Sequence, residues 1–308
     1  MKTLVSLLIA FMVFFVCSGQ SIKNYSQQMA TPTQNFPALA GWHGSLHTNL
    51  QARNQYSGLP VSYVTLNANI DGFIDTIRSV FSLNLAHDRL NTGWVLNESL
   101  EMIWTPKLVL RNELVLMPAL SFKSSQTAID WTRFNLNTYP QFNKPTLVPQ
   151  RESVRYNAFG AGFGIIYKET FFASHIHDIN QPNISFYDSD EHLVLRTYSF
   201  LLGHVFTFDD YKITPSLSYH NQGNLNLVSL ACNAQYKWIY VGAKYDFNGL
   251  AGVALGGEIM QRFRFSYSYD ITTSRLGNQT LGSHELAMRI WLFKDKVKRQ
   301  FLSNLPLM

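Results

Sequence analysis

The chain has 308 residues, enough for one large domain or two small ones, and a formal net charge of +5. Charged residues make up only 15%, against about 25% in typical soluble domains, while aromatic residues reach 14%. The net charge is small, and the sequence has no run of basic residues that would indicate a nucleic-acid partner. Because Cys17 lies in a segment we expect to be removed, Cys232 would remain alone, which excludes a disulfide scaffold and a multi-cysteine zinc site.

Residues 1–19 have the pattern of a secretory signal peptide. Lys2 supplies the positive start, residues 4–16 are apolar, and Cys17-Ser18-Gly19 precedes an expected cleavage site before Gln20. The apolar run is shorter than the about 20 residues that a membrane-spanning helix needs. Residues 20–42, rich in Gln, Pro, Asn and Ala, should follow as a segment that lies in the periplasm or tucks into a lumen.

From about residue 43 the dominant pattern is period-2 alternation, which predicts β-strands with two different faces. It is clearest at residues 262–270, where aromatic side chains at odd positions alternate with Arg264, Ser266, Ser268 and Asp270. Glu98 departs from the pattern, because the register puts it among outward positions, so either a bulge intervenes or Glu98 lies near an interface. The pattern predicts about fourteen strands of about ten residues, the length of a tilted membrane strand. We expect them at 43–53, 61–71, 77–87, 93–104, 108–122, 155–167, 170–178, 193–206, 211–221, 225–236, 238–247, 250–259, 262–272 and 283–293.

The connections between these strands differ in length by parity. If the chain starts in the periplasm, the even connections are short turns, and the long insertions at 123–154, 179–192 and 273–282 are all odd. Outer-membrane barrels have short periplasmic turns and longer outer loops, whereas a soluble barrel has no reason for such sorting. We therefore predict an all-β fold: a single antiparallel transmembrane β-barrel at 43–293 in the outer membrane, with 294–308 as a periplasmic tail.

Three stretches of the chain carry distinctive motifs. The opening stretch from Tyr25 contains Asn35, Pro37, Ala38 and Gly41, with Phe36 between Asn35 and Pro37. The closing stretch carries a Tyr-x-Tyr-Asp turn and a Gly-Ser-His-Glu motif, formed by Tyr267, Tyr269, Asp270, Gly282, Ser283, His284 and Glu285. The stretch 157–167 in the middle of the chain is rich in glycine. Together they resemble the PorP/SprF family of type IX secretion membrane proteins, whose opening motif usually has Asn directly before Pro.

The resemblance implies a function that the residues alone do not. It implies an outer-membrane protein of Bacteroidetes that works with the type IX secretion or gliding machinery. Such proteins help to export or hold large surface proteins, such as adhesins, through those partners' C-terminal sorting domains. The usual Asp-Pro of the long mid-chain loop is not evident here, and Tyr56-Ser57-Gly58 replaces a Trp-x-Gly pattern, so the client is not identified.

Four charged residues of the last two strands are candidates for a site. Asp270 and Glu285 should face the lumen near the outer rim, with Arg264 and Arg289 deeper in the same strand pair. They could fix an outer loop or a partner, or form an ion-pair network that stiffens the barrel. Both interpretations remain open at the level of the sequence.

Other candidate motifs point away from catalysis and from bound cofactors. Gly160, Gly162 and Gly164 share one inward face, which could make room for residues 20–41 or allow tight strand curvature. His175 and His177 share a strand face but lack a third metal ligand. A nucleophile elbow, a phosphate loop and a dinucleotide fingerprint are all missing from the sequence. We predict a protein without enzymatic activity, metal or cofactor; the alternative is a porin or transporter for small solutes or lipids.

Overall fold

The computed structural model describes residues 24–42, 46–59, 62–90, 94–110, 113–131, 151–186, 191–260, 262–273 and 280–292. In these ranges, no helix is both long enough and apolar enough to cross a membrane. The described residues contain three short 3-10 turns, η1 (Pro32–Gln34), η2 (Pro37–Leu39) and η3 (Asp75–Ile77), and one large antiparallel sheet.

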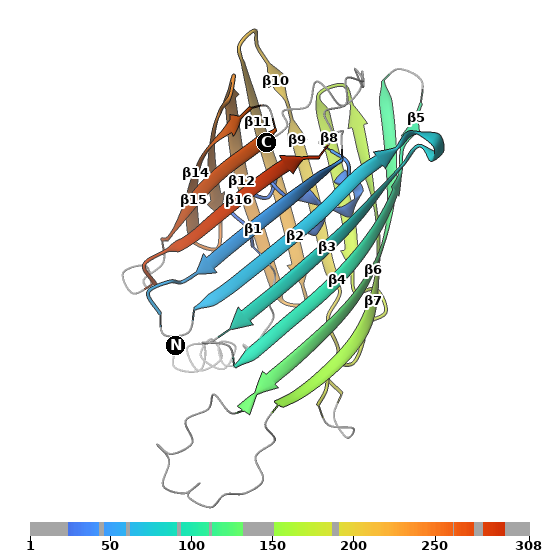
Figure 1. The fold of residues 1–308 in the computed structure, drawn as a ribbon, viewed down its shortest axis with the longest axis vertical. Coiled ribbons are helices and arrows are strands. Elements are labelled where there is room, and N and C mark those ends of the chain that lie inside the picture. The colour runs from blue at the N-terminus through green and yellow to red at the C-terminus, as the bar shows by residue number, and fades with distance from the viewer. Residues whose placement is uncertain are drawn as a thin grey trace, which may run out of the picture.

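The sheet is built from consecutive strands along the chain (Figure 1). Its members are β1 (His47–Gln55), β2 (Tyr63–Ile74), β3 (Ser79–Leu90), β4 (Val95–Pro106), β5 (Leu108–Val109), β6 (Leu114–Asp130), β7 (Arg151–Tyr167), β8 (Thr170–His177), β9 (Thr197–His204), β10 (Phe206–Thr207), β11 (Tyr211–Gln222), β12 (Leu225–Tyr236), β13 (Ile239–Asp246), β14 (Leu250–Ile259), β15 (Phe263–Thr272) and β16 (Ser283–Trp291). The short β5 continues β4 along β6, and the short β10 continues β9 along β11. The described part of the chain therefore forms fourteen membrane strands, as predicted.

The sheet closes on itself. β1 pairs with β16, where His47 lies opposite Trp291, and β9 pairs with β11, so each of the fourteen strands has a neighbour on both sides. Closure pairs the backbone N–H and C=O groups of the wall with each other, which a membrane requires because lipid offers them no partners. The first and last strands thus stabilise each other although they lie at opposite ends of the sequence.

The two faces of the strands divide as the alternation predicts. In β15, Phe265 and Tyr267 are 44% and 43% exposed to the outside, whereas Ser268 is 1% exposed in the lumen. Glu98 does point outward, and no bulge is needed to place it. It pairs with His87 of the neighbouring strand, with 3.2 Å between the carboxylate oxygen and Nδ1.

The two ends of the barrel differ. At one end, here called the inner end, the turns are tight: Lys168 and Lys237 adopt positive φ angles of 52° and 51° between β7 and β8 and between β12 and β13. At the opposite, outer end, β6 ends at Asp130 and β7 begins at Arg151, so the longest stretch of sequence between neighbouring strands falls on this side. In outer-membrane barrels the short turns face the periplasm.

Several strand bounds differ from the predicted ones. The strand predicted at 108–122 begins its long part at Leu114 and continues to Asp130, and its partner begins at Arg151 instead of 155. Residues 123–130 and 151–154, predicted as loop, instead extend the hairpin, where Asp130 lies opposite Arg151. Backbone pairing continues beyond the apolar band because a polar hairpin satisfies its hydrogen bonds whether or not lipid surrounds it.

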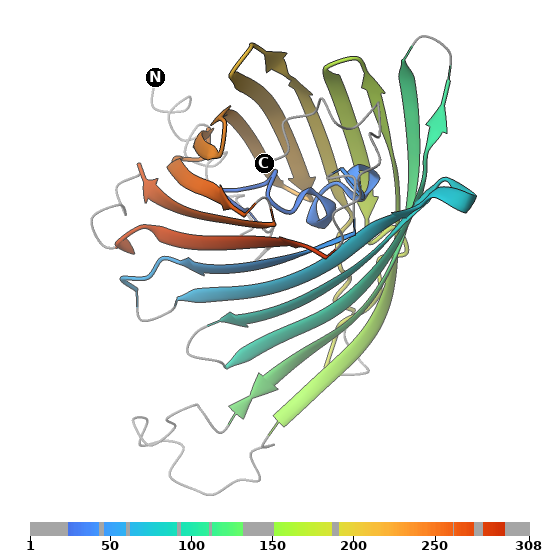
Figure 2. The same ribbon diagram turned by 45° about the horizontal axis from the view of Figure 1, so that its top comes forward.

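Residues 24–42, which we call the plug, lie inside the barrel. Figure 2 shows this blue segment surrounded by the strands. Two prolines start its turns η1 and η2, where a missing N–H costs nothing and φ is already suitable. Phe36, Leu39 and Trp42 of the plug are 0%, 0% and 1% exposed.

The inner half of the lumen is apolar where it meets the plug. Trp42 packs edge-on against Phe171 of β8, with ring centroids 4.9 Å apart. Phe36, Leu39 and Trp42 share one buried cluster with the wall residues Val115, Met117, Ile166, Phe171, Ala173, Leu201 and Val205. A wall that faces water inside a pore would be polar, so this apolar patch exists because the plug covers it.

The inward glycines of β7 serve two purposes. A Cβ added at Gly164 would lie 3.3 Å from the Ala38 side chain, so Gly164 makes room for the plug. Cβ atoms at Gly160 and Gly162 would instead lie 2.5 Å and 2.6 Å from ring nitrogens of His175. These two glycines accommodate a histidine of the adjacent strand.

We expect Trp42→Ala to loosen the plug without opening the barrel wall. Removal of a fully buried tryptophan costs about 3–5 kcal/mol, and this one anchors only the plug to the wall. The measurement is hydrogen exchange by mass spectrometry, in which peptides from residues 24–42 should lose protection while β-strand peptides keep theirs. Trp238→Ala is the control, because Trp238 is 63% exposed on the outside; equal loss of plug protection in both variants would contradict the assignment of Trp42 as an anchor.

Candidate functional site

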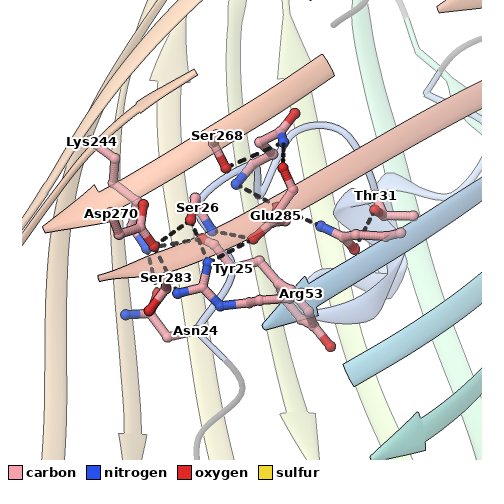
Figure 3. Close-up of polar contacts among 12 residues, drawn as sticks. Asn24, Tyr25, Ser26, Thr31, Arg53, Lys244, Ser268, Asp270, Ser283 and Glu285 are labelled. Carbon is pink, nitrogen blue, oxygen red and sulfur yellow. Dashed lines mark hydrogen bonds and ion pairs between the residues drawn. The ribbon is translucent and has the colours of Figure 1, made fainter. Parts of the chain in front are cut away.

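The most concentrated set of buried charges lies in the outer half of the lumen, where β1, β15 and β16 adjoin (Figure 3). Arg53 Nη2 lies 2.7 Å from Asp270 Oδ2, and Arg53 Nη1 lies 2.9 Å from Glu285 Oε2. The three residues are 3%, 4% and 0% exposed. We call Arg53, Asp270 and Glu285 the carboxylate clamp. The guanidinium, with two forked N–H groups, can serve both carboxylates at once.

The clamp holds the start of the plug by its backbone. Glu285 accepts hydrogen bonds from the N–H groups of Ser26 (2.9 Å) and Gln27 (3.1 Å). The Ser26 hydroxyl donates to Asp270 Oδ2 over 2.5 Å. Buried carboxylates are costly unless several donors satisfy them, and here the donors come from both the wall and the plug. The plug therefore completes the coordination of two buried charges.

Two charged residues of β13 hold the first residues of the plug, next to the clamp. Asn24 Nδ2 donates to Asp246 Oδ2 over 2.6 Å, and Lys244 Nζ donates to the Tyr25 carbonyl over 2.9 Å. The Tyr25 hydroxyl accepts from Asn67 Nδ2 at 3.0 Å. Burial raises the pKa of Tyr25 above its ordinary value, which keeps the hydroxyl neutral. The first described residues of the plug thus lie in the outer half of the lumen.

The other end of the plug is fixed near the inner end of the barrel. The Gly41 N–H donates to Asp71 Oδ2 over 2.7 Å, and the same carboxylate lies 2.6 Å from His47 Nε2 through Oδ1. Gly41 has a φ of 67°, and a Cβ there would lie 2.5 Å from Val80. Only glycine fits this position without strain. The plug therefore crosses the lumen and is tied at both ends.

The residues of the opening motif hold the plug in place across the lumen. The Asn35 carbonyl lies 3.3 Å from His177 Nε2, and the Pro37 carbonyl accepts from Thr105 Oγ1 at 3.2 Å. Pro37 begins η2, and Ala38 packs against Gly164.

The closing motif divides between the two faces of the wall. Asp270, Ser283 and Glu285 are buried in the lumen, whereas Tyr267, Tyr269 and His284 face outward. The Tyr267 hydroxyl lies 2.6 Å from His284 Nδ1, and Tyr269 donates to the Leu281 carbonyl at 3.4 Å. Gly282, with a φ of 70°, directly precedes β16, and Ser283 Oγ accepts from the Tyr56 N–H. The motif thus combines plug binding inside with an outward aromatic patch.

The sequence alone did not indicate Arg53 as the cation that pairs with Asp270 and Glu285. Arg264 and Arg289 lie deeper, as expected, but they contact other groups: Arg264 reaches Glu258 at 3.1 Å, and Arg289 donates to Asn49 (2.7 Å) and to the Ala30 carbonyl (2.5 Å). Arg53, an inward position of β1, could have been found only by knowing that β1 closes the barrel beside β16.

The histidine pair of β8 lies beside a serine of β6. The rings of His175 and His177 lie 4.3 Å apart, and His175 Nε2 lies 3.2 Å from Ser121 Oγ. Across the described ranges, no group of three or more His, Cys, Asp or Glu residues is arranged to hold a metal ion. The pair acts in lumen packing.

The chain was compared with known families once this geometry was established. The family model described as type IX secretion system membrane protein PorP/SprF matches residues 17–290. The chain belongs to the PorP/SprF family. Membership places this barrel in the outer membrane, in the context of the type IX secretion system, and the two family motifs quoted above meet at the plug and its clamp.

Solved structures similar to this PorP/SprF-family protein are outer-membrane barrels of low sequence identity. Omp33 of Acinetobacter baumannii aligns with a TM-score of 0.48 and 9% identity over 80% of this chain and 98% of its own. A FadL homologue of Pseudomonas aeruginosa gives 0.45 and 10% over 80% and 90%, and the KdgM porin gives 0.40 and 6% over 80% and 99%. No curated protein matches the chain in sequence. The fold assignment rests on the strand pairing itself.

We expect Arg53→Met to destabilise the folded barrel strongly. It leaves Asp270 and Glu285 buried without their shared cation, a loss of about 3–5 kcal/mol for a broken buried pair. The free energy of unfolding in urea, measured on protein in detergent or lipid, should fall by that amount. Arg155→Met is the control, since Arg155 is exposed and bonds Gln126, and should change stability by less than about 0.5 kcal/mol. Equal effects of the two variants would show that the clamp is not important for stability.

Proposed function

We propose that this barrel is a non-enzymatic membrane partner of the type IX secretion or gliding machinery, which helps to export or anchor a large secreted protein such as an adhesin. The observation that carries the proposal is the plug. Its two ends are bonded to Glu285 and Asp71, and its middle packs into an apolar wall. A lumen filled in this way favours a docking platform over a conduit for solutes.

The two ends of the barrel supply two surfaces for docking. The outer-end segments 123–154, 179–192 and 273–282 would contact the secreted client, while the short turns and residues 294–308 would face machinery beneath the membrane. Exposed loops on a rigid scaffold are the usual place for binding residues. The hairpin of β6 and β7 remains paired as far as Asp130 and Arg151. It offers a stiff scaffold for such binding residues.

We expect an affinity pull-down of the tagged barrel from mildly solubilised outer membrane to recover a large secreted protein with a C-terminal sorting domain. Mass spectrometry of the eluate is the measurement. The matched control is a tagged outer-membrane barrel of another family from the same membranes. Recovery of the barrel alone, in detergents that keep other complexes intact, would count against the proposal, as would normal surface display of clients after deletion of the gene.

If the protein were instead a porin or transporter, it should show a steady ion conductance in planar bilayers. We expect the purified wild-type protein to show no steady conductance, because the plug is bonded across the lumen. Trp42→Ala, which loosens the plug, should give intermittent openings, while Trp238→Ala should behave like wild type. Steady open channels of the wild-type protein would favour the porin.

A further inference from the structure

A groove of about 1070 Å³ crosses the outside of the barrel wall, on the face that Figure 1 shows in front. It runs from β15 and β16 across β1, β2, β3 and β4 to β6 and β7. We call it the wall groove. Its volume is close to the upper end of the range of about 300–1,000 Å³ that is common for ligand sites.

Small side chains on β1 and β2 make room for the groove. Ala52 of β1 lies between Leu286 of β16 and Leu66 of β2 in one row of outward residues. Ala68 of β2 lies likewise between outward leucines of β1 and β3 in the next row. These leucines are exposed and line the groove. This half of the groove therefore offers apolar surface of the kind that an acyl chain covers.

The other half of the groove is polar. Across β3, β4, β6 and β7, one row of opposing outward residues consists of His87, Glu98, Gln126 and Arg155. Glu98 Oε1 lies 3.2 Å from His87 Nδ1, and Arg155 Nε donates to Gln126 Oε1 over 2.8 Å. The second bond uses only one of the five N–H donors of the guanidinium, so it leaves both terminal amino groups to other acceptors.

The polar row lies at the outer edge of the apolar band. Deeper in the wall, the same face of β4, β6 and β7 carries Met102, Phe122 and Phe159 opposite one another. Along β6, the outward residues change from Phe122 through Ser124 to Gln126. The lipid-facing surface of a membrane barrel is apolar between its two interfaces, so this change places the row at the depth of the outer headgroups.

We propose that the wall groove binds a zwitterionic membrane lipid whose headgroup carries a phosphate and a primary ammonium. The lining has charges of both signs: Arg155 suits the phosphate, and Glu98, beside His87, suits the ammonium. A purely anionic headgroup would be repelled by Glu98, and a purely cationic one by Arg155. The two backbones are two strand spacings apart, about 10 Å, and the two side chains cover part of that distance. The acyl chains would lie against the leucines of the apolar half.

Native mass spectrometry of the purified full-length barrel in detergent, with one dioleoyl lipid added at a time, tests the headgroup. The three probes share their acyl chains and phosphate. Phosphatidylethanolamine has a primary ammonium, phosphatidylcholine has a methylated one without N–H donors, and phosphatidylglycerol has none. The wild type should bind phosphatidylethanolamine at least about threefold more tightly than either of the others, the effect of one exposed ion pair. Equal binding of the three lipids would overturn the proposal.

Charge variants test the two ends of the headgroup separately. Glu98→Gln should abolish the preference over phosphatidylglycerol and should bind phosphatidylglycerol more tightly than the wild type does, a gain that a damaged barrel would not show. Arg155→Gln should weaken all three lipids at least about threefold, because they share the phosphate. Glu191→Gln and Arg196→Gln are the controls, since they remove the same charges from the exposed β8–β9 connection, where Arg196 Nε also donates to an oxygen. If the groove variants bind the lipids as the controls do, the proposal fails.

Ala68→Phe tests the apolar half without changing any charge. Its ring would fill the space between the two leucines, so phosphatidylethanolamine should bind at least about threefold more weakly as its chains lose apolar contact. Ala243→Phe adds the same ring at an exposed position of β13 outside the groove and should leave binding unchanged. Equal binding by these two variants would overturn the assignment of the acyl chains to the groove. None of these measurements involves the secreted client, so this inference and the proposed function can fail independently.

Discussion

The arrangement of the lumen depends on one constraint, which is that the buried carboxylates of Asp270 and Glu285 need partners. Neither can lie in the barrel wall without a cation and several N–H donors, because the cost of burying a bare charge is far above what the fold can offset. Arg53 supplies the cation, and the backbone N–H groups of Ser26 and Gln27 add donors to the Glu285 oxygens that Arg53 and Gln51 of the wall also contact. The wall and the plug therefore depend on each other, because each satisfies polar groups of the other.

The same dependence holds at the inner end with different chemistry. There the wall presents apolar side chains, such as Phe171 and Met117, to a lumen that would otherwise be wet. Trp42 and Leu39 cover them, and Gly164 leaves the space for Ala38. Polar contacts hold the plug at both ends, through Glu285 and Asp71, and the apolar cluster buries its middle.

A plug of this kind changes what the barrel can do. Filling the lumen leaves the outer rim, the inner turns and the lipid-facing wall as the surfaces available to partners. A polar cavity of about 640 Å³ also lies beside the plug, toward the outer half of the barrel. The proposed docking of a secretion partner is therefore compatible with a lumen that holds the plug.

Local pattern determined most of the wall. Alternation of aromatic and polar residues in β15 gave its two faces, and the parity of loop lengths gave the orientation of the hairpins, because both depend on neighbours in the sequence. The long hairpin to Asp130 and the partner of Glu98 were not determined in this way, since each depends on which residue lies opposite on another strand. Alternation placed Asp270 and Glu285 in the lumen, but tertiary structure decided their partners. Arg53 meets Glu285 only because β1 closes against β16. Residues 24–42 lie in the lumen because of groups on distant strands, such as Glu285, which follows Ser26 by 259 positions. A sequence shows which residues need partners, but closure of the barrel selects them.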